Sequence, residues 1–102
     1  MAKIKNYAML IDGVWVQASN GKSFDSTNPT TGKVWARVPE ATEDDVDRAV
    51  KAAHRALYDG PWGKMTATER GHRLHRLADL LHSESEQLGR IESLDTGKML
   101  KI

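Results

Sequence analysis

The run from Asn28 to Val50 constrains the fold of this chain more than any other part of its sequence. It opens with turn-forming residues and continues with a short β-forming stretch, Val34 to Val38. Thr42 then has the character of a helix N-cap, and Asp45, three residues later, completes a capping box. The run therefore predicts a turn, a short strand and a capped helix in immediate succession.

Three apolar stripes predict three amphipathic helices in the second part of the chain. Gly60-Pro61 is predicted to end the first helix, with the glycine in the left-handed position that follows a helix. Thr66 and Glu69 repeat the capping pattern for a second helix, and a third, shorter helix is predicted to stop at Gly97. The stripes are Val46, Ala49, Val50, Ala53 and Leu57, then Leu74, Leu77, Ala78 and Leu81, then Leu88, Ile91 and Leu94.

Short strands separated by turns are predicted before the first helix. Asp12-Gly13 is a strong two-residue hairpin signal, because the tight turn of a hairpin needs positive φ angles, and Asn20-Gly21 repeats that signal. We therefore predict an α+β segment, with a short antiparallel β-meander in residues 1–41 followed by the three helices in residues 42–102.

Composition excludes several classes of protein. The net charge of +1 gives no field strong enough for a nucleic-acid or anionic-membrane partner, and no stretch approaches the roughly 18 apolar residues of a spanning helix. The absence of cysteine removes disulfides, thiolate zinc sites and thiolate nucleophiles from these residues. Without a recognisable signal peptide, a cytoplasmic location is the expectation.

The polar clusters of the second part favour a solvated surface. The histidines of the second helix lack a thiolate or a suitably placed carboxylate to complete a zinc site, and its arginines spread around the helix. Asp95-Thr96-Gly97-Lys98 lacks the glycine spacing of a phosphate-binding loop and is predicted to be a helix stop. A chain of 102 residues buries only about 60–65% of the surface that its unfolded form exposes. Because so small a buried fraction leaves stability marginal, we predict a segment that packs against another protein surface.

Four stretches together resemble the N-terminal segment of the NAD(P)-dependent aldehyde dehydrogenase superfamily. The resemblance covers the chain from about Leu10 to its end, and the four stretches follow one another at the separations typical of that family. They read LIDGVWV, NPTTGKVWARVPEATEDDVDRAVKAA, GPWGKMTATERGHRLHRLADLL and ESLDTGK.

The resemblance implies an oxidoreductase that converts an aldehyde to a carboxylic acid with NAD or NADP. In that family a cysteine thiolate attacks the aldehyde, hydride passes to the nicotinamide, and water activated by a glutamate hydrolyses the thioester. These groups, the cofactor loop and the strands that form homo-oligomers lie downstream of the matched segment. The chain would be a partial piece of a dinucleotide-binding domain, inactive alone and without a bound cofactor. The alternative is a stand-alone truncated paralogue that docks on a full-length enzyme as a structural module.

The resemblance also implies a partial site for a monovalent cation. In several family members, backbone carbonyls just before the Asn-Pro turn and the aspartate of the Asp-x-Gly-Lys stretch hold such an ion. The matching positions are Ser26, Thr27 and Asp95. Hard cations take more oxygen ligands than these three, so others would come from elsewhere. Asp95 has a second interpretation of equal weight to the cation ligand, namely a hydrogen-bonding residue at a helix end.

Overall fold

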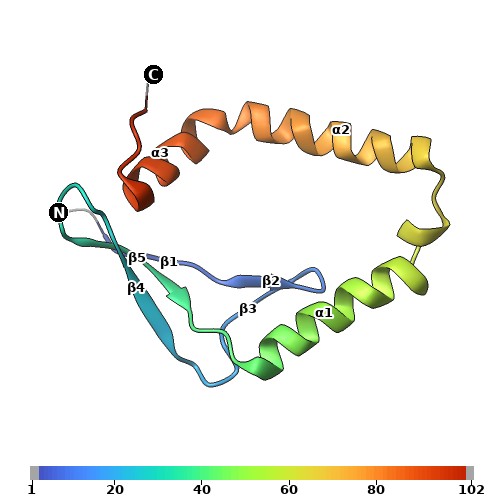
Figure 1. The fold of residues 1–102 in the computed structure, drawn as a ribbon, viewed down its shortest axis with the longest axis horizontal. Coiled ribbons are helices and arrows are strands. Elements are labelled where there is room, and N and C mark those ends of the chain that lie inside the picture. Colours follow the sequence, from blue (N-terminus) through green and yellow to red (C-terminus); the bar gives the residue numbers. More distant parts are fainter. Residues whose placement is uncertain (1–2, 101–102) are drawn as a thin grey trace.

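A computed structural model of the chain describes residues 3–100 and shows short strands followed by helices (Figure 1). The strands are β1 (Lys5–Asn6), β2 (Met9–Ile11), β3 (Val14–Val16), β4 (Ser23–Thr27) and β5 (Val34–Pro39). The helices are α1 (Glu43–Tyr58), the 3-10 helix η1 (Trp62–Lys64), α2 (Ala67–Ser83) and α3 (Ser85–Thr96). The α+β fold class predicted from the sequence is confirmed.

The strands form two separate sheets, where the sequence predicted one antiparallel meander. β2 and β3 make a hairpin whose turn residues, Asp12 and Gly13, have φ angles of 53° and 74°, as the Asp-Gly signal predicted. The other sheet has the order β1-β5-β4, with β4 antiparallel and β1 parallel to β5. The parallel strand β1 is not evident from any turn signal in the sequence.

The Asn20-Gly21 signal does not produce the predicted hairpin, because β3 and β4 belong to different sheets. Gly21 has the expected positive φ of 71°, but its N–H donates to the Ala18 carbonyl and closes a purely local turn. The neighbouring Ser19 N–H donates to the carboxylate of Asp45 in α1. This tertiary contact directs the connection toward the helix, so the strands on either side of it do not pair.

Both predicted capping boxes are confirmed. The hydroxyl oxygen of Thr42 accepts from the N–H of Asp45 at 3.2 Å, and the Asp45 carboxylate accepts from the N–H of Thr42 at 2.9 Å. Thr66 and Glu69 make the same reciprocal pair at 3.1 and 2.9 Å. Each box satisfies two backbone donors that the first helical turn leaves free, which fixes where α1 and α2 begin.

Gly60 ends α1 for a different reason from the one predicted. It is absent from the positive-φ residues, and the helix closes at Asp59, whose N–H donates to the Arg55 carbonyl at 2.8 Å. A Cβ atom on Gly60 would lie only 2.9 Å from the carbonyl oxygen of Ala56. Glycine is therefore required by close approach of the backbone, whereas Gly97, with φ of 76°, takes the predicted left-handed position after α3.

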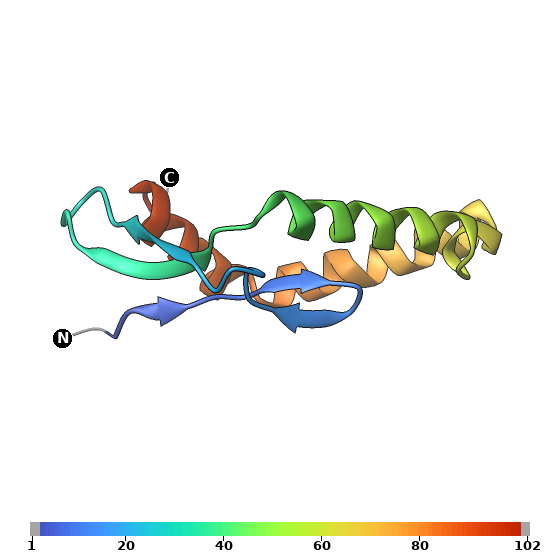
Figure 2. The ribbon, with the colours of Figure 1, turned by 90° about the horizontal axis from the view of Figure 1, so that it is seen from below.

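Very little of the described chain is buried. Among residues 3–100, the buried apolar side chains are Ala18 and Ala36, and the one buried charged side chain is Asp45. The radius of gyration is 17.1 Å, against about 13 Å for a compact domain of this length. The molecule measures 48 × 38 × 17 Å, and Figures 1 and 2 show its helices spread around the strands in a thin layer. No helix within residues 3–100 is both long enough and apolar enough to cross a membrane.

Candidate functional site

The end of α3 meets the turn between β4 and β5, two segments that lie far apart in the sequence (Figure 1). The hydroxyl of Ser26 donates a hydrogen bond to the Asp95 carboxylate. A Cβ atom on Gly97 would lie 3.0 Å from the Pro29 side chain, so the backbone after α3 rests directly on the Asn-Pro turn. The chain therefore brings its Asn-Pro-Thr-Thr-Gly and Asp-Thr-Gly-Lys stretches into contact.

Local hydrogen bonds shape the turn on the strand side of this junction. The side-chain oxygen of Asn28 accepts from the Thr30 N–H at 2.9 Å, and its backbone carbonyl accepts from the Gly32 N–H at 2.8 Å. Such an Asx turn holds the proline in place without help from the rest of the protein. Just before it, the β4–β5 register shifts between Ser26 and Thr27. Irregularities of this kind redirect side chains at the edge of a sheet.

The helix side of the junction is rich in oxygen. Asp95 lies in the last turn of α3, where the carbonyl groups give the helix its negative end. The Thr96 hydroxyl donates to the Glu92 carbonyl at 2.8 Å and accepts from the Lys98 N–H at 3.3 Å. The structure thus places Ser26 in contact with Asp95, and Thr27 is the adjoining residue of β4. This arrangement offers oxygen ligands of the kind a hard cation accepts.

A second polar cluster surrounds Asp45, whose side chain is wholly buried. Its carboxylate accepts from the Thr42 N–H at 2.9 Å, from the Ser19 N–H at 3.0 Å and from the Arg48 guanidinium at 2.6 Å. The backbone donors of Thr42 and Ser19 hold the pKa of the Asp45 carboxyl well below its usual range. The sequence indicated Asp45 as a cap, but the contact with Ser19 comes from tertiary structure and no local signal predicts it.

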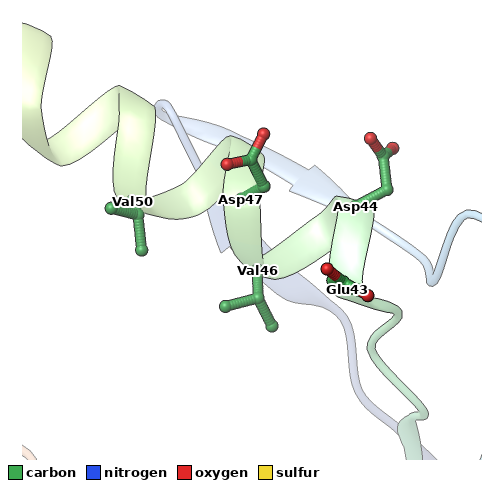
Figure 3. A pocket seen from close by; sticks show the side chains of 5 residues that line it. All are labelled: Glu43, Asp44, Val46, Asp47 and Val50. Atoms are coloured by element: carbon green, nitrogen blue, oxygen red, sulfur yellow. The ribbon is translucent and has the colours of Figure 1, made fainter.

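The apolar stripes form apolar faces on their helices, but most of the side chains in them are exposed to solvent. In Figure 3, Val46 and Val50 point to one side of α1, away from Asp44 and Asp47. Val50 is 62% exposed and Leu74 of α2 is 57% exposed. Leu77 and Leu81 on α2 are also exposed. Such extended apolar surface is typical of faces that pack against another part of a protein.

The histidines of α2 are exposed, as are Arg73 and Arg76, whereas Arg70 is half-buried. His72, Arg73 and Arg76, together with Glu69, line a shallow hollow there. Within residues 3–100 there is no group of three or more histidine, cysteine, aspartate or glutamate side chains that could hold a metal ion. The cation position that the family resemblance implies differs in kind, because it would combine one carboxylate with backbone carbonyl oxygens.

Comparison with known proteins identifies the segment. The family model described as the aldehyde dehydrogenase family matches residues 15–102. A dehydrogenase of Acinetobacter baylyi that acts on (Z)-2-((N-methylformamido)methylene)-5-hydroxybutyrolactone is 49% identical over 78 residues, which are 76% of this chain and 16% of that protein. The human mitochondrial 10-formyltetrahydrofolate dehydrogenase is 46% identical over 96 residues, which are 94% of this chain and 10% of that protein.

Solved structures agree with the sequence matches. An NAD-dependent aldehyde dehydrogenase from Sinorhizobium meliloti superposes with a TM-score of 0.91 at 40% identity, over 96% of this chain and 20% of that one. The NAD⁺ complex of an aldehyde dehydrogenase from Bacillus cereus gives a TM-score of 0.91 at 45% identity, over 95% of this chain and 20% of that one. The chain spans between 10% and 20% of the length of these four relatives. It belongs to the aldehyde dehydrogenase family, of which it is an N-terminal segment.

Proposed function

We propose that this chain is the N-terminal portion of an enzyme that oxidises an aldehyde to a carboxylic acid with NAD or NADP. The observation that carries the proposal is that this family segment leaves the apolar faces of both long helices uncovered, with Val50 62% and Leu74 57% exposed. Residues 1–41 and 42–102 would together form a partial piece of the dinucleotide-binding domain. The chain would supply scaffold, and the cysteine, glutamate and cofactor loop would come from the rest of the polypeptide.

The residues of this chain do not fit the dinucleotide itself. Within residues 3–100, the connection from β5 to α1 is the one direct passage from a strand to a helix, and it contains no glycine. The first turn of α1 carries Glu43, Asp44 and Asp45, whose carboxylates would repel a pyrophosphate from that helix end. The Bacillus cereus relative was solved as an NAD⁺ complex. We assign its cofactor contacts to residues beyond this segment.

We also make a proposal on the oligomeric state and cellular location of the complete protein. The family resemblance implies a homo-oligomeric enzyme, and we propose a cytoplasmic location for it. The small net charge of +1 supports the absence of a nucleic-acid or anionic-membrane partner for these residues. The relatives include both a cytosolic enzyme of Xenopus laevis and a mitochondrial enzyme of Homo sapiens. Fluorescence tagging of the complete protein would distinguish the two locations.

The activity is tested by comparing the isolated chain with a chimeric enzyme, made by replacing the matching segment of the Bacillus cereus enzyme with this chain. We expect no NAD reduction from the isolated chain with an aldehyde, because it contains no cysteine. The chimeric enzyme should reduce NAD, because its acceptor supplies the reacting groups. Activity of the isolated chain would contradict the proposal. So would a folded but inactive chimeric enzyme beside an active parent. A chain that binds the intact parent enzyme would instead support the docking-module alternative.

We further propose that Asp95, with oxygens of Ser26 and Thr27, contributes to a monovalent-cation site. Support comes from the contact between Ser26 and Asp95 and from the negative helix end beside them. In the chimeric enzyme, Asp95→Ala should raise the potassium concentration needed for half-maximal thermal stabilisation by about tenfold or more, since even partners of metal ligands contribute 10–100-fold.

Asp79→Ala is the matched control for the cation site, because Asp79 is an exposed helical aspartate with no ion pair within the described residues. Ser26→Ala separates the two interpretations of Asp95. If Asp95 serves only as the acceptor for the Ser26 hydroxyl, both substitutions should lower the melting temperature equally and leave the potassium response unchanged. That result would overturn the cation proposal.

A further inference from the structure

An asparagine followed by a glycine lies in the turn that leads from β3 to β4. Both Asn20 and Gly21 are exposed. The side-chain oxygen of Asn20 accepts from the Lys22 N–H at 2.9 Å, which makes an Asx turn. The ring that this hydrogen bond closes includes the Cγ atom of Asn20 and the backbone nitrogen of Gly21. The turn therefore holds a side-chain carbonyl carbon close to the nitrogen of the next residue.

The Cγ atom of Asn20 is open to attack by this nitrogen. The Lys22 N–H polarises the side-chain carbonyl and would stabilise the oxyanion that forms when a nucleophile adds to Cγ. Gly21 has no Cβ atom to shield its nitrogen, and a Cβ atom built there would meet nothing within 4 Å. The Gly21 N–H donates to the Ala18 carbonyl at 2.8 Å, but water readily replaces such an exposed hydrogen bond.

The other asparagines of the chain lack this combination. Asn28 makes the same Asx turn, with the Thr30 N–H at 2.9 Å, but Pro29 follows it. A proline nitrogen carries no hydrogen to lose, so it cannot form a stable ring with Cγ. Asn6 lies in β1 and is followed by Tyr7, whose N–H is held by a carbonyl of β5 at 2.9 Å. Asn20 is therefore the asparagine that both sequence and fold leave reactive.

We propose that Asn20 is a self-modification site, at which the Gly21 nitrogen converts the asparagine to a succinimide that water opens to aspartate or isoaspartate. The nitrogen loses its proton to hydroxide and bonds to Cγ, while the Cγ–Nδ2 bond breaks and ammonia leaves with a proton from water. Hydrolysis between the ring nitrogen and Cγ gives aspartate. Hydrolysis between that nitrogen and the backbone carbonyl carbon gives isoaspartate, whose main chain runs through Cβ and Cγ. Water is the co-reactant, and no electrons are transferred.

The isoaspartyl product would disturb the contacts on either side of the turn. Ser19 precedes Asn20, and its N–H donates to the buried Asp45 carboxylate of α1 at 3.0 Å. On the other side, the Lys22 carbonyl accepts from the Glu40 N–H at 2.9 Å. Isoaspartate inserts an additional carbon atom into the main chain between these two anchors. Because the anchors are fixed, the added length should loosen the Ser19 N–H from Asp45 at the start of α1.

The test is an incubation of the complete protein that carries this segment, in mildly alkaline buffer, beside the same protein unfolded in urea. Peptide mapping by mass spectrometry follows the change from amide to carboxyl group, and an isoaspartate-specific methyltransferase detects the isoaspartyl linkage. We expect conversion of Asn20 in the folded protein, with Asn28 unconverted as the internal control. If Asn20 stayed intact in the folded protein while the unfolded protein converted, the turn would be protective and the proposal would be overturned.

Two substitutions test the role of the residue that follows each asparagine. Gly21→Ala should slow conversion of Asn20 by about tenfold or more, since a side chain there displaces the nitrogen from Cγ. Pro29→Gly should make Asn28 convert, because it supplies a backbone N–H within the same kind of Asx turn. Equal rates for Gly21→Ala and the parent would show direct hydrolysis by water, and an intact Asn28 in Pro29→Gly would show that the turn does not activate its asparagine. Either result would overturn the proposal.

Hydrogen–deuterium exchange measures the consequence at α1. The Ser19 amide should exchange about tenfold or more faster after conversion, since hydrogen bonds to charged groups are among the stronger ones. Asn20→Gln is the matched control, because glutamine would have to close a larger ring and should keep slow exchange after the same incubation. Unchanged exchange at Ser19 in the converted protein would overturn the link between the turn and α1. These measurements do not depend on dehydrogenase activity, so failure of the proposed function would leave them interpretable.

Discussion

Gly63→Ala is expected to destabilise the corner between α1 and α2 by at least about 2 kcal/mol, near the upper part of the range for overpacking. A Cβ atom on Gly63 would lie only 1.7 Å from the carbonyl oxygen of Leu57. The conflicting atom belongs to the backbone, so no side chain can rotate to relieve it. The 3-10 helix η1 would have to move away from the end of α1, and α2 would move with it.

The control for Gly63 is another glycine. Gly71 lies in α2, and a Cβ atom there meets nothing within 4 Å. Gly71→Ala should therefore stabilise the protein by about 0.5–1 kcal/mol, because alanine loses less backbone freedom in a helix. Urea unfolding of the chimeric enzyme measures both. Equal midpoints for Gly63→Ala and the unsubstituted chimeric enzyme would show that the corner tolerates the displacement.

The same corner fixes how α2 follows α1. The Met65 N–H donates to the Pro61 and Trp62 carbonyls, at 3.1 and 3.2 Å, so η1 is a short hydrogen-bonded link between the two long helices.

The helices could be predicted from the sequence because their signals are local. Thr42 with Asp45, and Thr66 with Glu69, are paired within one turn, and the structure confirms both boxes. The strand pairing could not be predicted in the same way. β1 pairs with β5, more than two dozen residues further along, and no nearby turn marks that register. Asn20-Gly21 carried a correct turn signal but could not show that Asp45 would bind the adjacent backbone.

The junction between Ser26 and Asp95 was indicated by family resemblance alone. The two residues are 69 positions apart, and composition or periodicity gives no reason to join them. The resemblance named the residue types, whereas the structure added the contact of Gly97 with Pro29 that brings them together.

Asp45→Asn is expected to be the most damaging isosteric change of a charged group in the described chain. The carboxylate accepts from the N–H groups of Thr42 and Ser19 and from Arg48, and asparagine replaces one acceptor oxygen with a donor. The new amide N–H group would then face another N–H donor in a buried position, and the Arg48 guanidinium would lose its carboxylate partner. The urea midpoint of the chimeric enzyme at pH 7 should fall clearly. Asp44→Asn is the control, because Asp44 is 71% exposed and its Arg48 contact is 3.4 Å.

Lowering the pH should reduce the difference in stability between the Asp45→Asn variant and its parent. Because backbone donors hold the pKa of Asp45 below its usual value, about 3.9 in unfolded chains, folding favours the ionised form. The resulting stability is fully present above that usual value and is lost as the pH falls through it toward the lower folded pKa. The gap between the urea midpoints of Asp45→Asn and the parent should therefore stay constant from pH 7 to about pH 5 and narrow below about pH 4. A gap that stays constant down to pH 3 would show that geometry alone, and not the ionised carboxylate, holds Ser19 to α1.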